Sequence, residues 1–126
     1  MTAKKQAGYV QDREIVDGVM MIRIAGVFTK ETTPNICRQV KVSSGKHKIK
    51  GIILDFKGVT GVDSSAFACL ISVMKDHLKK GLKVGAINLN KEAKAIVEVL
   101  RIKSVVCSYK CEETALKAMA KRGKNE

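Results

Sequence analysis

The sequence predicts an α/β fold: a mixed, mostly parallel sheet of about five strands with about four helices. Two strand-like runs near the N-terminus are joined by Asp17-Gly18, a hairpin signal. After them, helix-spaced and strand-like apolar segments alternate to the end of the chain, which places the later strands parallel with crossover helices between them. Residues 52–56 are apolar on nearly every position, as in a strand covered on both faces.

The chain of 126 residues is long enough for one domain with its own core. We expect an ordered core over about residues 8–120, a short polar N-terminal segment and a basic C-terminal tail. The longest apolar stretch, residues 19–28, is interrupted by Arg23, which argues against a membrane span. No apolar segment follows the N-terminal lysines, so the sequence predicts no secretory signal and a cytoplasmic location.

Residues 9–16 form the first predicted strand, with Tyr9 and Ile15 as its inward anchors. Residues 19–26 form the second, antiparallel to the first across the Asp17-Gly18 turn.

A first helix follows, capped by Thr32 or Thr33, with Pro34 in the first turn, where a missing N–H costs nothing. Its buried stripe is Ile36, Cys37 and Val40, and residues 43–45 end it.

The centre of the chain reads as a buried strand, a glycine-bearing loop over residues 57–62, and a helix from about Ser64 to Lys79. Asp63 or Ser64 is the expected N-cap. The helix's buried stripe is Phe67, Leu70, Ile71, Met74 and Leu78. Serine hydroxyls therefore stand at a helix N-terminus, whose partial positive charge and free N–H groups suit a phosphate.

The last third repeats the pattern. Gly81 ends the central helix behind two lysines, and residues 82–87 form the next parallel strand. Asn90 caps a helix with an apolar stripe of Ala93, Ile96, Val97 and Leu100. Residues 104–107 form a short strand, and Glu112 opens a final helix carrying Ala115, Leu116 and Met119.

We find no catalytic set in the sequence. His47 lies in a lysine-rich loop and His77 on the exposed side of the central helix, so neither serves Ser64 as a base. The glycines match no phosphate-binding or dinucleotide motif. The sequence thus predicts a chain that is not an enzyme and holds no cofactor.

The four cysteines fit reduced thiols in a cytoplasmic protein, and none has metal-ligand spacing, so we expect no metal site. Cys69 is expected to be a small buried residue and Cys107 part of a strand. We assign Cys37 and Cys111 to surface thiols.

A net charge of +12 has two interpretations. It reflects a heavily solvated lysine surface, or it serves an anionic partner such as nucleic acid or anionic lipid. The lysines are scattered, and no aromatic residues interleave them as in a single-strand binder. The first interpretation is favoured, without excluding nucleic acid.

The central stretch also carries a family resemblance. Leu54-Asp55-Phe56, a short loop, then Asp63-Ser64-Ser65 and a helix resemble the signature of STAS domains, specifically bacterial anti-sigma-factor antagonists. That family typically shows Asp-Ser-Ser-Gly-Leu, where this chain has Ala66 and Phe67 in the last two positions. The resemblance spans roughly residues 10–119 in the order of elements.

The resemblance implies a phosphoprotein that regulates transcription. Ser64 would be the phosphoacceptor, with Ser65 the less favoured position, and the partners would be an anti-sigma factor/serine-protein kinase and a serine phosphatase. It implies partner contacts from two segments, listed as Phe28, Thr29, Thr60, Gly61, Asp63, Ser64, Ser65, Ala66 and Phe67. Thr29 stands where the family often has an acidic residue, and Ala66 narrows the approach to the helix by a methyl group.

Two alternatives stay open. Stand-alone STAS domains also serve as adaptors in stress-signalling assemblies or lipid-transporter complexes. A basic domain that binds nucleic acid or anionic lipid is the alternative of another class, and its binding would weaken steeply with salt.

Overall fold

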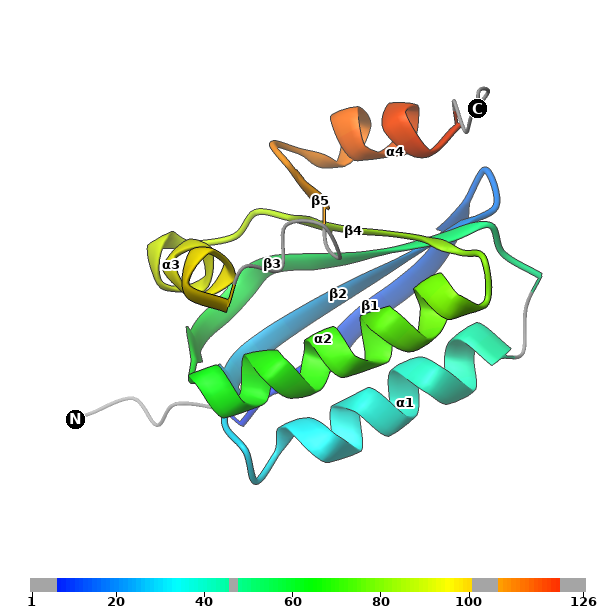
Figure 1. Ribbon diagram of the computed structural model, residues 1–126. Coiled ribbons are helices and arrows are strands. Elements are labelled where there is room, and N and C mark those ends of the chain that lie inside the picture. The colour runs from blue at the N-terminus through cyan, green and yellow to red at the C-terminus, as the bar shows by residue number, and fades with distance from the viewer. Residues whose placement is uncertain (1–6, 46–47, 101–106, 121–126) are drawn as a thin grey trace.

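The computed structural model describes residues 7–45, 48–100 and 107–120, and these form a five-stranded sheet with helices on both faces (Figure 1). The strands are β1 (Tyr9–Val16), β2 (Val19–Phe28), β3 (Gly51–Val62), β4 (Lys83–Ile87) and β5 (Cys107–Tyr109). The helices are α1 (Thr33–Gly45), α2 (Ser64–Lys79), α3 (Lys91–Leu100) and α4 (Glu112–Ala120). β1 pairs antiparallel with β2, and the other neighbours in the order β1-β2-β3-β4-β5 are parallel. The predicted mixed α/β fold is confirmed.

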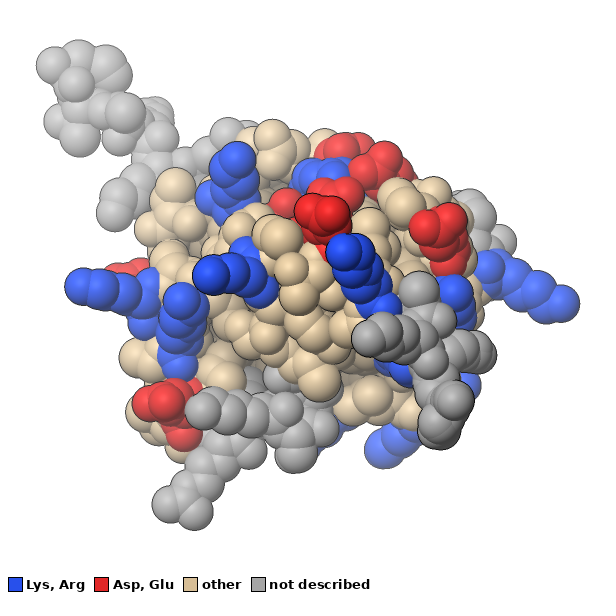
Figure 2. Space-filling model, turned by 90° about the horizontal axis from the view of Figure 1, so that it is seen from above, with Lys and Arg blue, Asp and Glu red and all other residues tan. Residues whose placement is uncertain are grey.

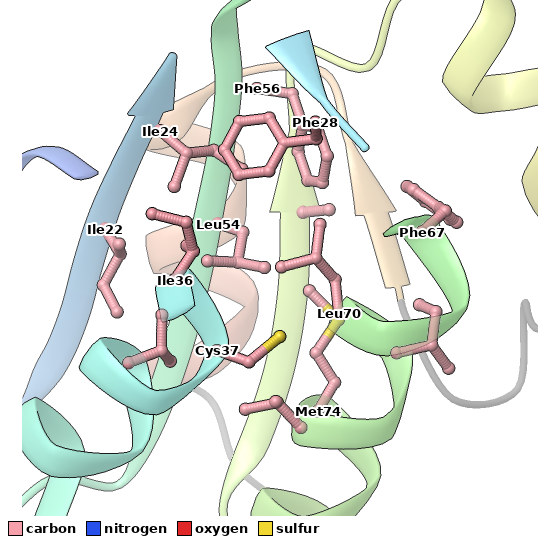
Figure 3. Packing of buried hydrophobic residues seen from close by; sticks show 14 of the residues in the cluster. Ile22, Ile24, Phe28, Ile36, Cys37, Leu54, Phe56, Phe67, Leu70 and Met74 are labelled. Carbon is pink, nitrogen blue, oxygen red and sulfur yellow. The ribbon is translucent and has the colours of Figure 1, made fainter. Parts of the chain in front are cut away.

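The helices divide between the two faces of the sheet. α1 and α2 run side by side under one face and α4 lies over the other (Figure 1). On the central strands, alternate residues serve alternate faces. The larger core, which includes residues of α1, α2 and α3, takes from the strands Met20, Ile22, Ile24, Ile52, Leu54 and Phe56. Figure 3 shows Ile22, Leu54 and Phe56 of this set with Ile36 of α1 and Leu70 of α2. Val19, Met21, Ile53 and Ile87 meet Ala115 and Met119 of α4. Burial on both faces explains why these strands are apolar at nearly every position.

The predicted hairpin is confirmed, since Asp17 and Gly18 both have positive φ, 52° and 81°, as a tight turn between antiparallel strands requires. The prediction for Ile15 is wrong, because its side chain is 44% exposed. β1 is the edge strand of the sheet, and the buried strand residues of the larger core come from β2, β3 and β4. Ile15 therefore lies in a strand, as predicted, but its side chain is not buried.

The loop predicted over residues 57–62 is wrong, because β3 continues through these residues and ends at Val62. β2 is longer as well, and Phe28 pairs with Val62. The glycines serve a close approach of two strands here. A Cβ at Gly58 would lie 2.8 Å from the Ala25 Cβ and 3.2 Å from the Ile24 carbonyl oxygen. The register shifts between Arg23 and Ala25, next to this contact.

Gly58→Ala is expected to destabilise the fold by about 2 kcal/mol, because the new methyl group overpacks against the β2 backbone. Gly61→Ala is the matched control. Its Cβ would meet the nearest Val27 methyl at 3.6 Å, which is ordinary contact, so we expect almost no change. Urea denaturation compares the two midpoints. Equal midpoints for the two variants would contradict the close approach.

The central helix has the predicted bounds, and its stripe of Phe67, Leu70, Ile71 and Met74 is buried. Its last turn differs from the prediction: Leu78 is 38% exposed and His77 is 2% exposed. Residue 77 continues the stripe three residues after Met74. The His77 Nδ1 donates to the Val73 carbonyl oxygen at 2.8 Å, so the buried ring has a polar partner in its own helix.

Several other elements match the sequence. Lys80 is the C-cap of α2, and the next residue, Gly81, has a φ of 87°. The Asn90 side chain accepts from the Ala93 N–H at 2.8 Å and so caps α3, with Ala93 and Val97 buried. α4 begins at Glu112. Of the strand predicted at residues 104–107 only Cys107 is described, and it begins β5, which runs to Tyr109. Residues 104–106, His47, the Leu100 side chain and both predicted terminal segments apart from Ala7 lie outside the described residues.

Candidate functional site

The candidate site is the N-terminus of α2, directly after β3. Asp63 is the N-cap: its Oδ1 accepts from the Ala66 N–H at 2.7 Å, and its carbonyl oxygen accepts from the Phe67 N–H at 3.0 Å. Of the two residues expected at the N-cap, Asp63 and Ser64, it is Asp63 that occupies this position. Ser64 is thus the first helical residue, and its side chain is exposed.

The segment after β2 lies beside this helix start. The Asp63 N–H donates to the Phe28 carbonyl oxygen at 3.2 Å, which joins the two segments directly. The Thr29 carbonyl oxygen accepts from both the N–H of Thr33, at 3.0 Å, and its hydroxyl, at 2.7 Å. The two segments expected to face a partner therefore share one edge of the sheet, at the carboxyl ends of two parallel strands, where binding sites of α/β folds gather.

The predicted contact residues divide into a surface set and a core set. Asp63, Ser64, Ser65 and Thr60 are exposed, and Thr29 and Gly61 are half-buried. Phe28, Ala66 and Phe67 are buried, each at 1% exposure or less. These three side chains pack under the site, where they position the helix start, and do not form its outer surface.

The expectation that Ala66 narrows the approach to the helix is wrong. Ala66 is 0% exposed and belongs to the larger core cluster, so its methyl group faces inward. Replacing the glycine that the family typically has therefore adds core contact and leaves the two serines exposed.

A pair of cysteines behind the site was not predicted as a pair. The Cys37 and Cys69 sulfur atoms lie 3.2 Å apart, one on α1 and one on α2. Cys37 is buried, so its assignment as a surface thiol is wrong. Cys69 is half-buried. Burial raises the pKa of Cys37 to about 12, and the neighbouring Cys69 adds to this. The stripe on α1 that includes Cys37 was the sequence signal for its burial.

The other two cysteines are exposed. Cys107 lies in β5, as expected. At Cys111, hydrogen bonding with Thr114 lowers the thiol pKa.

An ionic cluster on the α4 face was also missed. The Arg23 guanidinium donates to Asp12 at 3.0 Å, Glu14 at 2.9 Å and Glu112 at 2.9 Å. The Arg23 Nε lies 3.7 Å from a carboxylate oxygen of Asp55, its partner in the β2–β3 register. The hydrogen bond to Glu14, and after it the one to Glu112, raises the Arg23 pKa against the opposing effect of burial. The cluster ties β1, β2, β3 and α4 together.

Asp55 does not assist the serines. Its carboxylate accepts from the Lys57 N–H and the Asn88 side chain, both at 2.9 Å, and lines a polar groove with Arg23 and Glu112. The signal in the sequence was the single polar residue within each of two apolar runs, Arg23 and Asp55.

Charge on the α4 face is mixed (Figure 2). Lysine and arginine side chains are spread among uncharged residues, most acidic side chains lie toward the upper right of this view, and a further acidic group lies at its lower left. Within the described ranges, no three histidine, cysteine or acidic residues are grouped to hold a metal ion. None of the helices described here is long and apolar enough to cross a membrane.

Solved structures share this fold. An anti-sigma factor antagonist from Mycobacterium paratuberculosis is 15% identical and superposes with a TM-score of 0.77 over 90% of this chain and 94% of its own. The unphosphorylated anti-sigma factor antagonist SpoIIAA is 15% identical, with a TM-score of 0.72 over 90% of this chain and 98% of its own.

The murine anion transporter Slc26a9 contains a similar domain. It is 15% identical with a TM-score of 0.73, over 83% of this chain and 18% of the transporter. The curated proteins include no match to the chain. The STAS domain model of protein families matches residues 11–118, which is most of the sequence, and the chain therefore belongs to the STAS domain family.

Proposed function

We propose that the chain is an anti-sigma-factor antagonist, a protein-binding module switched by phosphorylation of Ser64. The observation that carries the proposal is the exposed Ser64 hydroxyl at the first position of α2, beside the Thr29 segment. In this role the unphosphorylated form sequesters an anti-sigma factor/serine kinase, and a serine phosphatase restores it. In this role the chain is the substrate of the kinase and the phosphatase and is not itself an enzyme. It acts in transcription signalling in the bacterial cytoplasm.

The fold tolerates a phosphate at this position. The N-terminus of α2 carries partial positive charge, and no acidic side chain lies in its first turn. A phosphoserine adds roughly two negative charges and three acceptor oxygens, to which backbone N–H groups at a helix start can donate hydrogen bonds. Phosphorylation is therefore expected to leave the domain folded.

The switch acts locally. Against a net charge of +12, one phosphate changes the long-range field little. At the surface, however, it stands next to the exposed Asp63 carboxylate and concentrates negative charge where a neutral hydroxyl stood. A partner surface that fits the hydroxyl then meets both a larger group and repulsion.

The test is release of a sigma factor. The purified chain is added to a complex of the anti-sigma kinase with its sigma factor, and free sigma factor is measured by size-exclusion chromatography. The proposal expects release by the wild-type chain and none by Ser64→Asp. Binding of the kinase without release would contradict the antagonist function and favour an adaptor.

The similarity to a transporter domain keeps the adaptor as a second candidate. Adaptor binding to a stress-signalling or lipid-transporter complex would survive Ser64→Asp. Binding to nucleic acid or anionic vesicles would also survive it but would weaken steeply as salt is raised.

A further inference from the structure

The geometry points to a reversible disulfide between Cys37 and Cys69, formed by exchange with a low-molecular-weight disulfide. This inference is independent of the proposed function. It uses two nucleophilic side chains that the phosphorylation site leaves unused.

The two thiols already face each other across a helix–helix contact. Their sulfur atoms are 3.2 Å apart, against about 2.05 Å in a disulfide, so closure requires a shift of roughly 1 Å. The Cys37 sulfur points from α1 toward α2 (Figure 3). A void of about 10 Å³ adjoins Cys37, Leu70 and Met74, so the space beside the Cys37 side chain is not completely filled.

Unequal exposure sets the order of events. Cys37 is 6% exposed and lies within the larger core, whereas Cys69 is half-buried. A small disulfide from solution therefore reaches Cys69 first. The Cys37 sulfur then lies next to the modified Cys69 sulfur, and the burial of Cys37 shields it from other reactants.

The exchange balances in two steps. The Cys69 thiolate, its proton lost to water, attacks one sulfur of RSSR, forms a mixed disulfide and expels RS⁻. The Cys37 sulfur then attacks the Cys69 sulfur, and its proton passes to the departing RS⁻, which leaves as the second RSH. The two protein thiols are oxidised by two electrons, and RSSR is reduced to two RSH after protonation.

The bond would fasten the two elements that carry the proposed partner surface. α1 begins four residues after Thr29, and Cys69 lies five residues after Ser64 on α2. The closed loop of the chain includes the whole of β3. Because a cross-link of this span constrains the unfolded chain, oxidation is expected to raise the melting temperature by roughly 5 °C or more.

The test uses the full chain with Cys107→Ser and Cys111→Ser, since both of these thiols are exposed and would form adducts of their own. The protein is incubated with oxidised glutathione and examined by thiol titration, intact mass and thermal melting. We expect both remaining thiols to disappear with the loss of two hydrogen atoms in a monomer, and dithiothreitol to restore them.

Adding Cys69→Ser in the same background is the control, and it should leave Cys37 as a free, unreacted thiol. A stable glutathione adduct on Cys69 with Cys37 still free would overturn the inference. A disulfide between two chains would overturn it as well, because it would show that the pair reacts outward.

Discussion

Replacing Ser64 with aspartate is expected to lower the affinity for the anti-sigma kinase at least roughly 100-fold. The carboxylate places a fixed negative charge at the exposed first position of α2, next to Asp63, where the proposed interface accommodates a neutral hydroxyl. Ser64→Ala keeps the site neutral and should bind within about threefold of the wild type. Isothermal titration calorimetry with the purified kinase measures all three.

Ser65→Asp is the matched control, because it adds the same charge one residue along the same exposed turn. On a helix the neighbouring side chain points about 100° away, so its loss of affinity should be smaller, less than about tenfold. Equal losses from the two aspartates would contradict a switch specific to Ser64. Both variants should unfold at or above the wild-type midpoint, since an acidic side chain is favourable at a helix N-terminus.

Phe67→Ala is expected to lower the free energy of unfolding by about 4 kcal/mol. The Phe67 side chain is 1% exposed and meets the Phe56 ring at a centroid distance of 5.8 Å and a tilt of 49°. It fastens the first turn of α2 to the core, one turn after Asp63. Urea denaturation of the variant, with the slope compared to wild type, measures the loss.

Phe67→Leu supplies the control, because leucine is the residue typical of the resembled family at this position. It should cost only about 1 kcal/mol and leave kinase binding unchanged, since the side chain does not reach the surface. A loss below about 1 kcal/mol for Phe67→Ala would contradict the packing role. Loss of binding by a stable Phe67→Leu protein would instead return Phe67 to the contact surface.

The features predicted from sequence are those specified by near neighbours. Asp17-Gly18 specifies a tight turn through two left-handed residues, and Asn90 caps α3 within one turn. The 3.6-residue period of α2 correctly places Phe67 and Leu70 in the core. In each case the decisive interaction lies within a few residues.

The features that sequence did not predict depend on contacts between distant segments. Gly58 looks like a turn residue until β2 is placed against it. Arg23 and Asp55 are partners only once the register of β2 and β3 is known. The approach of Cys37 to Cys69 follows from the packing of α1 on α2, which no periodicity in either helix specifies.

The candidate site contains one feature that was predicted from the sequence and one that was not. The order Asp63-Ser64-Ser65 after a strand predicts an exposed serine at a helix start, and the structure has one. The inward direction of Ala66 was missed, although Ala66 lies four residues before the buried Leu70 and therefore on the same helical stripe.

The most direct test of the central claim is phosphopeptide mapping of the protein isolated from the cells that make it, with Ser64→Ala expressed in parallel. We predict a phosphate on Ser64 in the wild-type chain and none at this position or at Ser65 in the variant. A bare Ser64 under growth and stress alike would contradict the phosphorylation switch.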